Sequence, residues 1–318
     1  MKTTSVQLFV SILCIVCLAA TGSCFAADKD QRPDIDIEFM VSIDKVAAKS
    51  PETMLLYRCA PDRSAKAQES QLKEIFGNAF FLETVEMSGG IFAANMERLW
   101  SKPPDPSTKG TELQEKVALE QSKNFLNRIK GIPEEKTLVY FSGDRMEFIQ
   151  KDGEQRSVPA GWNVTYRRLL QDFEVMGPGG KIKIFMGTDG DVVGYMRVWR
   201  QLTLEKQVPI ISAHEAAEEF KKDPVGRALI ADVEKIKVTD MRLAYLELGM
   251  SMPQHYLQPV YFIKAIAFSK GKKEDLLEIP YTRYIAALMT PPQALWPEGR
   301  EYKSQERIEK KYRPGDDE

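Results

Sequence analysis

Cysteine is scarce in this chain, and its distribution limits what can hold the fold together. Three of the four cysteines, Cys14, Cys17 and Cys24, lie within the first 26 residues, so that only Cys59 remains beyond them. A single cysteine cannot form an intramolecular disulfide. We expect Cys59, in the strand-like stretch TMLLYRCAP, to be a buried small hydrophobic residue and not a nucleophile. The fold must then depend on its hydrophobic core.

Histidine is rarer still, with two residues in the whole chain. His214 begins the stretch HEAAEE, in which a zinc protease would need a second histidine where Glu218 stands. His255 lies in a proline-bounded loop without companion ligands. The sequence also lacks G-x-S-x-G, C-x-x-C and EF-hand patterns. We therefore predict no catalytic residue, no metal ligand and no cofactor, while an envelope hydrolase built on scattered carboxylates stays open as an alternative.

Long apolar runs are absent after the N-terminal region, and no later segment reaches the ~20 apolar residues that a membrane span needs. Residues 1–26 combine Lys2, an apolar run at 6–20 and small residues up to Ala26, a pattern typical of a secretory signal peptide. We expect cleavage near Ala26 and export to the periplasm or the cell exterior. Lipid anchoring at Cys24 is the alternative.

An excess of charge of one sign is missing as well. Of the 44 lysines and arginines one is Lys2, which leaves 43 against 46 acidic residues in the exported chain. A nucleic-acid binder needs a net basic field, so we expect no nucleic-acid partner. Residues 27–36 are charged and indicate a flexible leader, and residues 298–318 have the composition of a charged disordered tail.

Helical periodicity occurs in three separate segments. In residues 212–221, Ser212 and Glu215 have capping-box spacing, and apolar residues recur at helical intervals. Residues 62–77 and 111–131 show the same periodicity, and each ends at a glycine. We predict an amphipathic helix in each segment.

Each predicted helix is followed by short alternating runs that are typical of antiparallel strands. The stretches PPDPST at 103–108 and KQVPII at 206–211 separate these groups. We therefore predict an α+β fold of tandem modules, each an antiparallel sheet meander packed on a helix. The predicted modules are an N-terminal module at 37–102, whose status as a true third module is left open, a central module at 109–205 and a C-terminal module at 206–297.

The stretch GPGGKIKIFMGTDGDVVGYMRVWR, residues 177–200, begins with glycines that could surround a phosphate. A dinucleotide-binding fingerprint opens a helix, however, and here the glycines precede the alternating run KIKIFM, which indicates a strand. Asp189 and Gly190 stand between two alternating runs, which is the pattern of a β-hairpin turn. We predict a hairpin and no nucleotide site.

Residues 166–202 contain, in this order, a short apolar stretch, a glycine, a strand, a D-G turn and a second strand. This order resembles the repeat of the PepSY and thermolysin-propeptide group. The helix at 212–221 and the run PVYFIKAIAF at 259–268 are similar to further parts of that group's repeat. The resemblance implies a cystatin-like sheet that wraps a helix, in secreted bacterial proteins that include protease propeptides. No catalytic residue belongs to that group's module.

Two short stretches mix arginine with aromatic residues, a combination enriched at binding hot spots. The candidate partner-binding residues are Tyr166, Arg167, Arg197, Trp199 and Arg200. One interpretation places Trp199 in the core and the arginines on solvated rims. The other is that an exposed sheet face or edge receives an extended peptide by strand addition.

Together these observations favour an exported, non-enzymatic protein that binds a protein or peptide partner, such as a protease or sensor that it modulates. The alternatives are the carboxylate-based envelope hydrolase and a purely structural component of the envelope. The sequence does not identify the partner or the oligomeric state.

Overall fold

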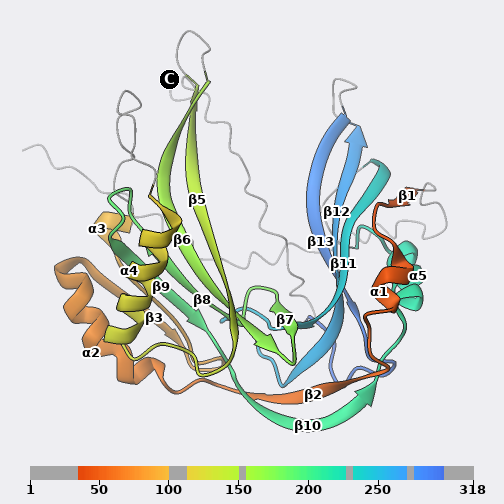
Figure 1. The fold of residues 1–318 in the computed structure, drawn as a ribbon, viewed down its shortest axis with the longest axis horizontal. Coiled ribbons are helices and arrows are strands. Elements are labelled where there is room, and N and C mark those ends of the chain that lie inside the picture. Colours follow the sequence, from red (N-terminus) through yellow and green to blue (C-terminus); the bar gives the residue numbers. More distant parts are fainter. Residues whose placement is uncertain (1–34, 100–112, 150–154, 227–231, 271–275, 297–318) are drawn as a thin grey trace, which may run out of the picture. The chain divides into compact units, whose positions relative to one another are not determined.

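The computed structural model describes residues 35–99, 113–149, 155–226, 232–270 and 276–296 (Figure 1). The helices are α1 (Ile43–Ala47), α2 (Ala65–Phe76), α3 (Met96–Leu99), α4 (Glu115–Arg128) and α5 (Ala213–Lys222), with a 3-10 turn at Gly77–Ala79. The strands are β1 (Asp36–Phe39), β2 (Thr53–Ala60), β3 (Phe80–Val85), β4 (Gly90–Asn95), β5 (Thr137–Ile149), β6 (Gln155–Leu170), β7 (Phe173–Met176), β8 (Lys181–Met186), β9 (Val192–Val198), β10 (Gln201–Pro209), β11 (Val233–Leu246), β12 (Tyr256–Lys270) and β13 (Leu276–Ala286).

All 13 strands of the described residues belong to one mixed sheet. Its main path runs β10-β2-β12-β11-β7-β6-β8-β9-β4-β3, while β1, β13 and β5 pair with β11, β12 and β6. Strand β11 pairs in parallel with β1 and with β7, and the other pairs are antiparallel.

This sheet contradicts the predicted α+β fold of tandem meanders packed on helices. Strand β2 pairs with β10 along its length and with β12 at Tyr57 and Arg58, which joins strands from all three predicted modules in one sheet. The expected connector at 206–211 lies largely within β10. The prediction was wrong because alternation indicates which residues form strands and which face is buried, but it does not specify pairing between strands far apart in the chain.

Other parts of the predicted organisation cannot be compared with the structure. The linker at 103–108, the signal peptide and the charged tail at 298–318 lie outside the described residues. The boundaries of the modules therefore stay a prediction.

The predicted helices are confirmed as α2, α4 and α5. At the start of α5, Ser212 Oγ accepts a hydrogen bond from the Glu215 amide (3.2 Å), and Glu215 Oε2 accepts one from the Ser212 amide (2.7 Å). This reciprocal pair is the predicted capping box, and it satisfies amide groups that a helix start leaves without an intrahelical acceptor. Helix α2 ends before Gly77, whose φ of 70° continues the chain away from the helix axis.

The predicted hairpin at 177–200 is confirmed as β8 and β9. The turn is closed by a hydrogen bond from the Gly187 amide to the Asp191 carbonyl (2.9 Å), and Gly190 has a φ of 85°, which favours glycine. Beyond the turn the two strands run antiparallel from Met186 to Lys181. The glycines before β8 thus introduce a strand and not a helix.

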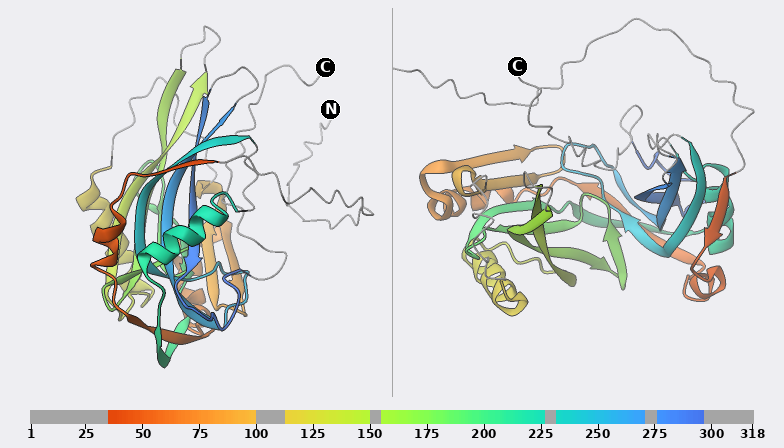
Figure 2. Two further views of the ribbon diagram at one scale, coloured as in Figure 1. Left: turned by 90° about the vertical axis from the view of Figure 1, so that its right-hand side faces the viewer. Right: turned by 90° about the horizontal axis from the view of Figure 1, so that it is seen from above.

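The helices pack on the sheet through alternating strand residues. Helix α4 contacts β5, β6 and β9, helix α2 contacts β3 and β4, and α1 and α5 contact β11 and β13 respectively (Figure 1). In the left view of Figure 2, α5 lies across the strands of the C-terminal half. No described helix packs across the opposite face of β5, β6, β8, β9 and β4.

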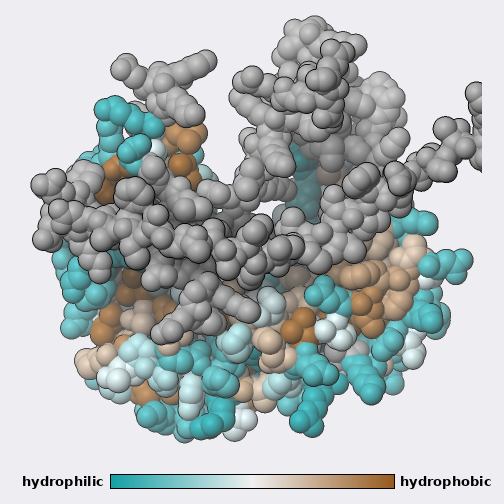
Figure 3. Space-filling view, turned by 180° about the vertical axis from the view of Figure 1, so that it is seen from behind, coloured by the Kyte–Doolittle hydropathy of each residue, from teal (hydrophilic) through white to brown (hydrophobic). Residues whose placement is uncertain are grey.

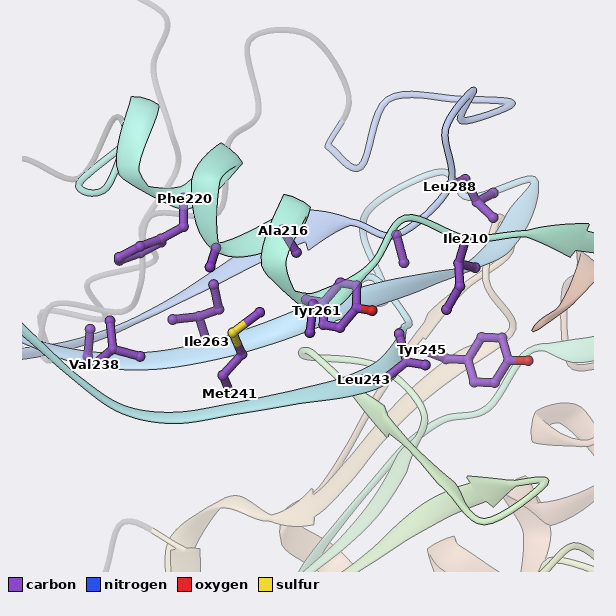
Figure 4. Close-up of a cluster of buried hydrophobic side chains, with 14 of the residues drawn as sticks. Ile210, Ala216, Phe220, Val238, Met241, Leu243, Tyr245, Tyr261, Ile263 and Leu288 are labelled. Atoms are coloured by element: carbon purple, nitrogen blue, oxygen red, sulfur yellow. The ribbon is translucent and has the colours of Figure 1, made fainter. Parts of the chain in front are cut away.

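Two large hydrophobic clusters form the core. In the first, Ala216 and Phe220 of α5 point toward Val238, Met241 and Ile263 of β11 and β12 (Figure 4). The second packs side chains of α2 and α4 against β4, β6, β8 and β9, and its members include Leu72, Phe125, Val164, Ile182 and Tyr195. Apolar burial of this extent is the main stabilising contribution in the described part of the chain, whose one cysteine, Cys59, is free.

The described surface is mixed in character, and brown hydrophobic areas interrupt the teal hydrophilic ones in Figure 3. Several large hydrophobic side chains are exposed, among them Phe81, Leu138, Val139, Tyr140 and Leu204. None of the described helices is long and apolar enough to cross a membrane.

Candidate functional site: an open sheet face and a free strand edge

Alternation along β8 sends its side chains to opposite faces of the sheet. Ile182 and Ile184 are fully buried beneath the helices, so Lys181, Lys183 and Phe185 lie on the other side. We call this side, made by β5, β6, β8, β9, β4 and β3 opposite α2 and α4, the open face.

Aromatic side chains form a row along one part of the open face. The ring centroids of Phe81 and Phe92 are 6.1 Å apart, and Phe92 stands edge to face with Phe185 at 6.1 Å. The Lys183 ammonium lies 4.8 Å from the centroid of the Phe185 ring, within the range of a cation–π interaction. Phe81 is 41% exposed, so the row reaches solvent at its outer end.

A charged group lies at the other part of the open face, around the buried Glu174 of β7. Its carboxylate accepts a hydrogen bond from the Tyr140 hydroxyl (2.6 Å) and forms ion pairs with Arg242 (3.0 Å) and Arg167 (3.4 Å). Burial and this hydrogen bond raise the pKa of Tyr140. Arg242 also lies 5.3 Å from the ring of Phe262, which extends the charged group onto β12.

Lys181 adds another positive charge beside this group. It stands directly opposite Arg167 in the register of β6 and β8. Burial, followed by the charges of Arg167 and Lys183, lowers the pKa of Lys181 to about 8. Within the described part of the chain, the Lys181 ammonium has no hydrogen-bond acceptor and no carboxylate partner. Three cations, Lys181, Arg167 and Arg242, therefore lie around the buried carboxylate of Glu174, and Arg242 is also paired with Asp240 (3.6 Å).

The second feature is the edge of β5. Among the described strands, β5 pairs only with β6, so its other edge carries unpaired backbone groups. Leu138, Val139 and Tyr140 are consecutive on this edge, and they are 37%, 44% and 44% exposed. The edge adjoins the open face because Tyr140 also contacts Arg167, whose guanidinium lies 5.9 Å from its ring centroid.

Of the residues predicted from sequence to bind a partner, Arg167 lies on the open face. Tyr166 points to the opposite side, where its hydroxyl lies 2.8 Å from Ser122 Oγ of α4. Arg197 is paired with Asp62 (2.9 Å) and also donates to the Gly131 carbonyl (3.1 Å). The five residues are therefore not brought together in one surface.

Trp199 and Arg200, also predicted as contact residues, are buried. Trp199 Nε1 donates to Glu135 (3.1 Å), and the Arg168 guanidinium lies 4.3 Å from the indole centroid. Arg200 is fully enclosed and is held by Glu247, as well as by the carbonyls of Leu248 (2.8 Å), Gly249 (3.0 Å) and Met252 (2.7 Å). Trp199 thus belongs to the core, as one of the two interpretations held, whereas Arg200 does not lie on a solvated rim.

Potential metal ligands and the Cys59 thiol are two further features of the described residues. No group of three or more His, Cys, Asp and Glu side chains there could hold a metal ion. Cys59 is partly buried and packs against the core, and burial raises the pKa of its thiol to about 12. Because the thiolate is the nucleophilic form, this shift disfavours a nucleophilic role for Cys59.

Sequence reasoning missed Lys181, Glu174 and Arg242. The signal for Lys181 was present, because it alternates with the buried isoleucines of β8 and must lie on the opposite face. Glu174 and Arg242 meet across β7 and β11, strands about 70 residues apart whose pairing no local pattern indicates.

Comparisons with known proteins add little. No family model matches the chain, and no curated protein matches it. Among solved structures, an uncharacterized protein from Eubacterium rectale ATCC 33656 is similar, with a TM-score of 0.45 and 8% sequence identity over 76% of this chain and 86% of that chain. This likeness is too distant to assign a fold or a function. The resemblance to the PepSY group stays a prediction.

Proposed function

We propose that this chain is an exported, non-enzymatic protein that binds an extended segment of a protein or peptide partner along the free edge of β5. The observation that carries the proposal is the run of exposed apolar side chains, Leu138 to Tyr140, on an edge strand whose outer backbone groups have no partner in the described sheet. Such an edge can accept a further strand, with main-chain hydrogen bonds supplying affinity and alternate side chains supplying specificity.

Other edges of the sheet carry features that oppose strand addition, and β5 lacks them over its first half. Strand β10 bears Glu205 and Lys206 next to each other, and β13 contains Pro280. Charges and prolines on an edge disfavour pairing with another chain. Residues 137–143 of β5, with the sequence TLVYFSG, contain neither. The remaining edge strands also carry charges, Glu83 in β3 and Asp36 with Glu38 in β1. This contrast selects β5 as the docking strand.

The charged group next to β5 gives the docked segment a chemical preference. A strand paired with β5 would send alternate side chains over Tyr140 and toward Arg167. The Arg167 and Arg242 guanidiniums and the Tyr140 hydroxyl already surround a carboxylate, that of Glu174. Acidic or polar side chains are favoured there over basic ones.

Export follows from the predicted signal peptide at residues 1–26, so the partner we propose is another exported protein, such as a protease or a sensor whose activity the bound chain modulates.

Selection from a library of random dodecapeptides, with the exported chain (residues 27–318) as bait, tests this function. We expect selected peptides to bind the wild type and to lose about tenfold or more in affinity for Val139→Lys, because the new charge opposes burial of the edge. Leu204→Lys is the matched control, since Leu204 is an exposed apolar residue on the different edge strand β10.

Methylation of alternate backbone nitrogens in a selected peptide provides a second test of strand addition. Strand addition requires the peptide's own N–H groups, so methylation of the paired set should abolish binding, while methylation of the other set should not. Failure to select any peptide, or equal affinities for the wild type and Val139→Lys, would contradict the proposed function.

A further inference from the structure

We infer that Lys181, together with Arg167 and the aromatic row Phe185, Phe92 and Phe81, forms a binding site on the open face for an amphiphilic carboxylate, a small acid with one carboxylate and an apolar body. This site shares Arg167 with the charged group next to the β5 edge, but it does not depend on strand addition.

The head of the site is the Lys181 ammonium, which has no carboxylate partner among the residues that the structure describes. Lys181 faces Arg167 across the β6 and β8 pair and Lys183 along its own strand, and both are cations. Its partner position on β9 is Val198, which is apolar and buried. Glu174, the carboxylate that pairs with Arg167, is already engaged by Arg167, Arg242 and Tyr140. An incoming carboxylate would therefore meet an ammonium that has no competing anion among the described residues.

Desolvation makes this position suited to an anion. A partly buried ammonium is unfavourable without a partner, and hydrogen bonds between ionised groups are stronger where water is partly excluded. The pKa of Lys181 is lowered to about 8 because the ammonium is partly buried and lies near other cations. A bound carboxylate would raise this pKa again and favour the charged form of Lys181.

The tail of the site is the aromatic row. Phe185 lies four residues from Lys181 on β8, which corresponds to roughly 13 Å along a strand. Between them Lys183 covers the Phe185 ring, and Phe92 and Phe81 continue the row across β4 and β3. An extended apolar chain whose carboxylate stays at the Lys181 ammonium would thus pass Lys183 and reach the Phe185 ring with its far end. The combination of a cation without a carboxylate partner among the described residues and a row of rings that is partly buried at Phe185 and Phe92 and exposed at Phe81 favours an amphiphilic acid over an inorganic anion.

Titration of the exported chain with decanoate, at concentrations below its micelle formation, tests the site by calorimetry. Decanol, which has the same chain without the charge, and acetate, which has the charge without the chain, are the matched ligands. We expect decanoate to bind more tightly than either by about tenfold or more, because it uses both parts of the site. Equal binding of decanol and decanoate would overturn the inference, as would no binding of decanoate.

Two substitutions of Lys181 test whether decanoate binds at this residue. Lys181→Gln should weaken decanoate binding by about tenfold or more, whereas Lys181→Arg should retain most of it. Lys206→Gln, which removes an exposed lysine from β10, is the control and should leave the affinity unchanged. If Lys181→Gln bound decanoate as well as the wild type, or if only glutamate-containing peptides depended on Lys181, the inference would be wrong.

The nuclear magnetic resonance signal of the Lys181 side chain provides a readout that a purely structural role would not change. The pKa of Lys181 should rise when decanoate binds, and the affinity should fall as the pH rises from about 7 to about 9, because the free ammonium loses its proton in that range. Because neither readout involves the β5 edge, the site can fail while peptide binding at β5 holds, and the reverse is equally possible.

Discussion

Arg168 and Glu247 meet in the interior of the protein, where Arg168 Nη1 lies 3.3 Å from Glu247 Oε2 and both side chains are excluded from solvent. The other carboxylate oxygen, Oε1, accepts a hydrogen bond from the Arg200 amide (3.0 Å) and lies 3.5 Å from Arg200 Nη1. The buried Glu247 carboxylate thus pairs with two buried guanidiniums, one from β6 and one from the connection between β9 and β10. Such a group is tolerated only because its charges are paired and hydrogen-bonded.

Removal of this carboxylate should destabilise the fold strongly. Glu247→Gln leaves two buried guanidiniums without their shared anion, and we expect the free energy of unfolding to fall by about 3–5 kcal/mol. Glu205→Gln is the matched control, because Glu205 forms a two-point ion pair with Arg58 (2.8 and 3.0 Å) that is solvent-exposed. The control should cost about 1 kcal/mol or less. Urea unfolding of both variants measures the difference, and similar losses would contradict the structural role of Glu247.

The glycines before β8 should be needed for close packing and not for ligand binding. Gly180 has a φ of 63°, and a Cβ there would lie 2.4 Å from Val175 Cγ1. Gly77 has a similar φ of 70° but no atom within 4 Å of the added Cβ. Both alanine variants carry the backbone strain of positive φ, which at Gly77 is combined with a ψ of −148°. Gly180→Ala adds a steric clash with Val175 and should lower the free energy of unfolding by more than about 2 kcal/mol. A Gly180→Ala variant as stable as the wild type would show that this glycine is not needed for close packing.

Lys181 should reduce the stability of the fold at neutral pH. Its pKa is about 8 in the folded chain against 10.5 for an ordinary lysine, so the folded state disfavours the proton. The resulting cost is complete below about pH 8 and disappears as the pH rises toward about 10.5, where the unfolded chain also loses the proton.

Replacement of Lys181 by methionine should therefore stabilise the protein at pH 7, by about 1–2 kcal/mol after allowance for solvent screening. The gain should shrink at about pH 10. Denaturant unfolding at both pH values measures it, with the exposed Lys206→Met as the control. A loss of stability at pH 7 would mean that the Lys181 ammonium has a partner in the folded chain.

Export predicts a defined N-terminus for the mature protein. If the signal peptide is cleaved after Ala26, N-terminal sequencing of the protein recovered from the exported fraction should begin at Ala27. A lipid-modified N-terminus at Cys24 would support the anchored alternative instead. Retention of residues 1–26 on the recovered chain would contradict export by this route.

The local elements could be predicted from the sequence, and their assembly could not. Ser212 and Glu215 identified the start of α5, and Asp189 with Gly190 identified the turn between β8 and β9, because the physical causes of these features lie within a few residues. The pairing of β2 with both β10 and β12 depends on strands about 150 and 200 residues away. No local pattern specifies it, so the predicted tandem modules were wrong.

In the candidate site, too, features set by neighbouring residues could be predicted from the sequence, and contacts between distant residues could not. Arg167 was recognised because it adjoins an aromatic residue, and alternation in β8 was enough to place Lys181 opposite the core. Arg200 was expected at the surface because arginine usually is. Its burial depends on Glu247, which lies 47 residues further along the chain and gives no sign of the contact in its own neighbourhood.

Peptide binding at β5 is tested most directly by backbone amide hydrogen exchange, measured with and without a peptide selected from the dodecapeptide library. If the peptide adds a strand to the sheet, alternate amides in Thr137–Phe141, those that point outward from β5, become protected, while the amides of the β10 edge at Gln201–Pro209 do not change. Protection at β10 or on another surface, with the exchange of Thr137–Phe141 unaltered, would contradict binding at the free edge of β5.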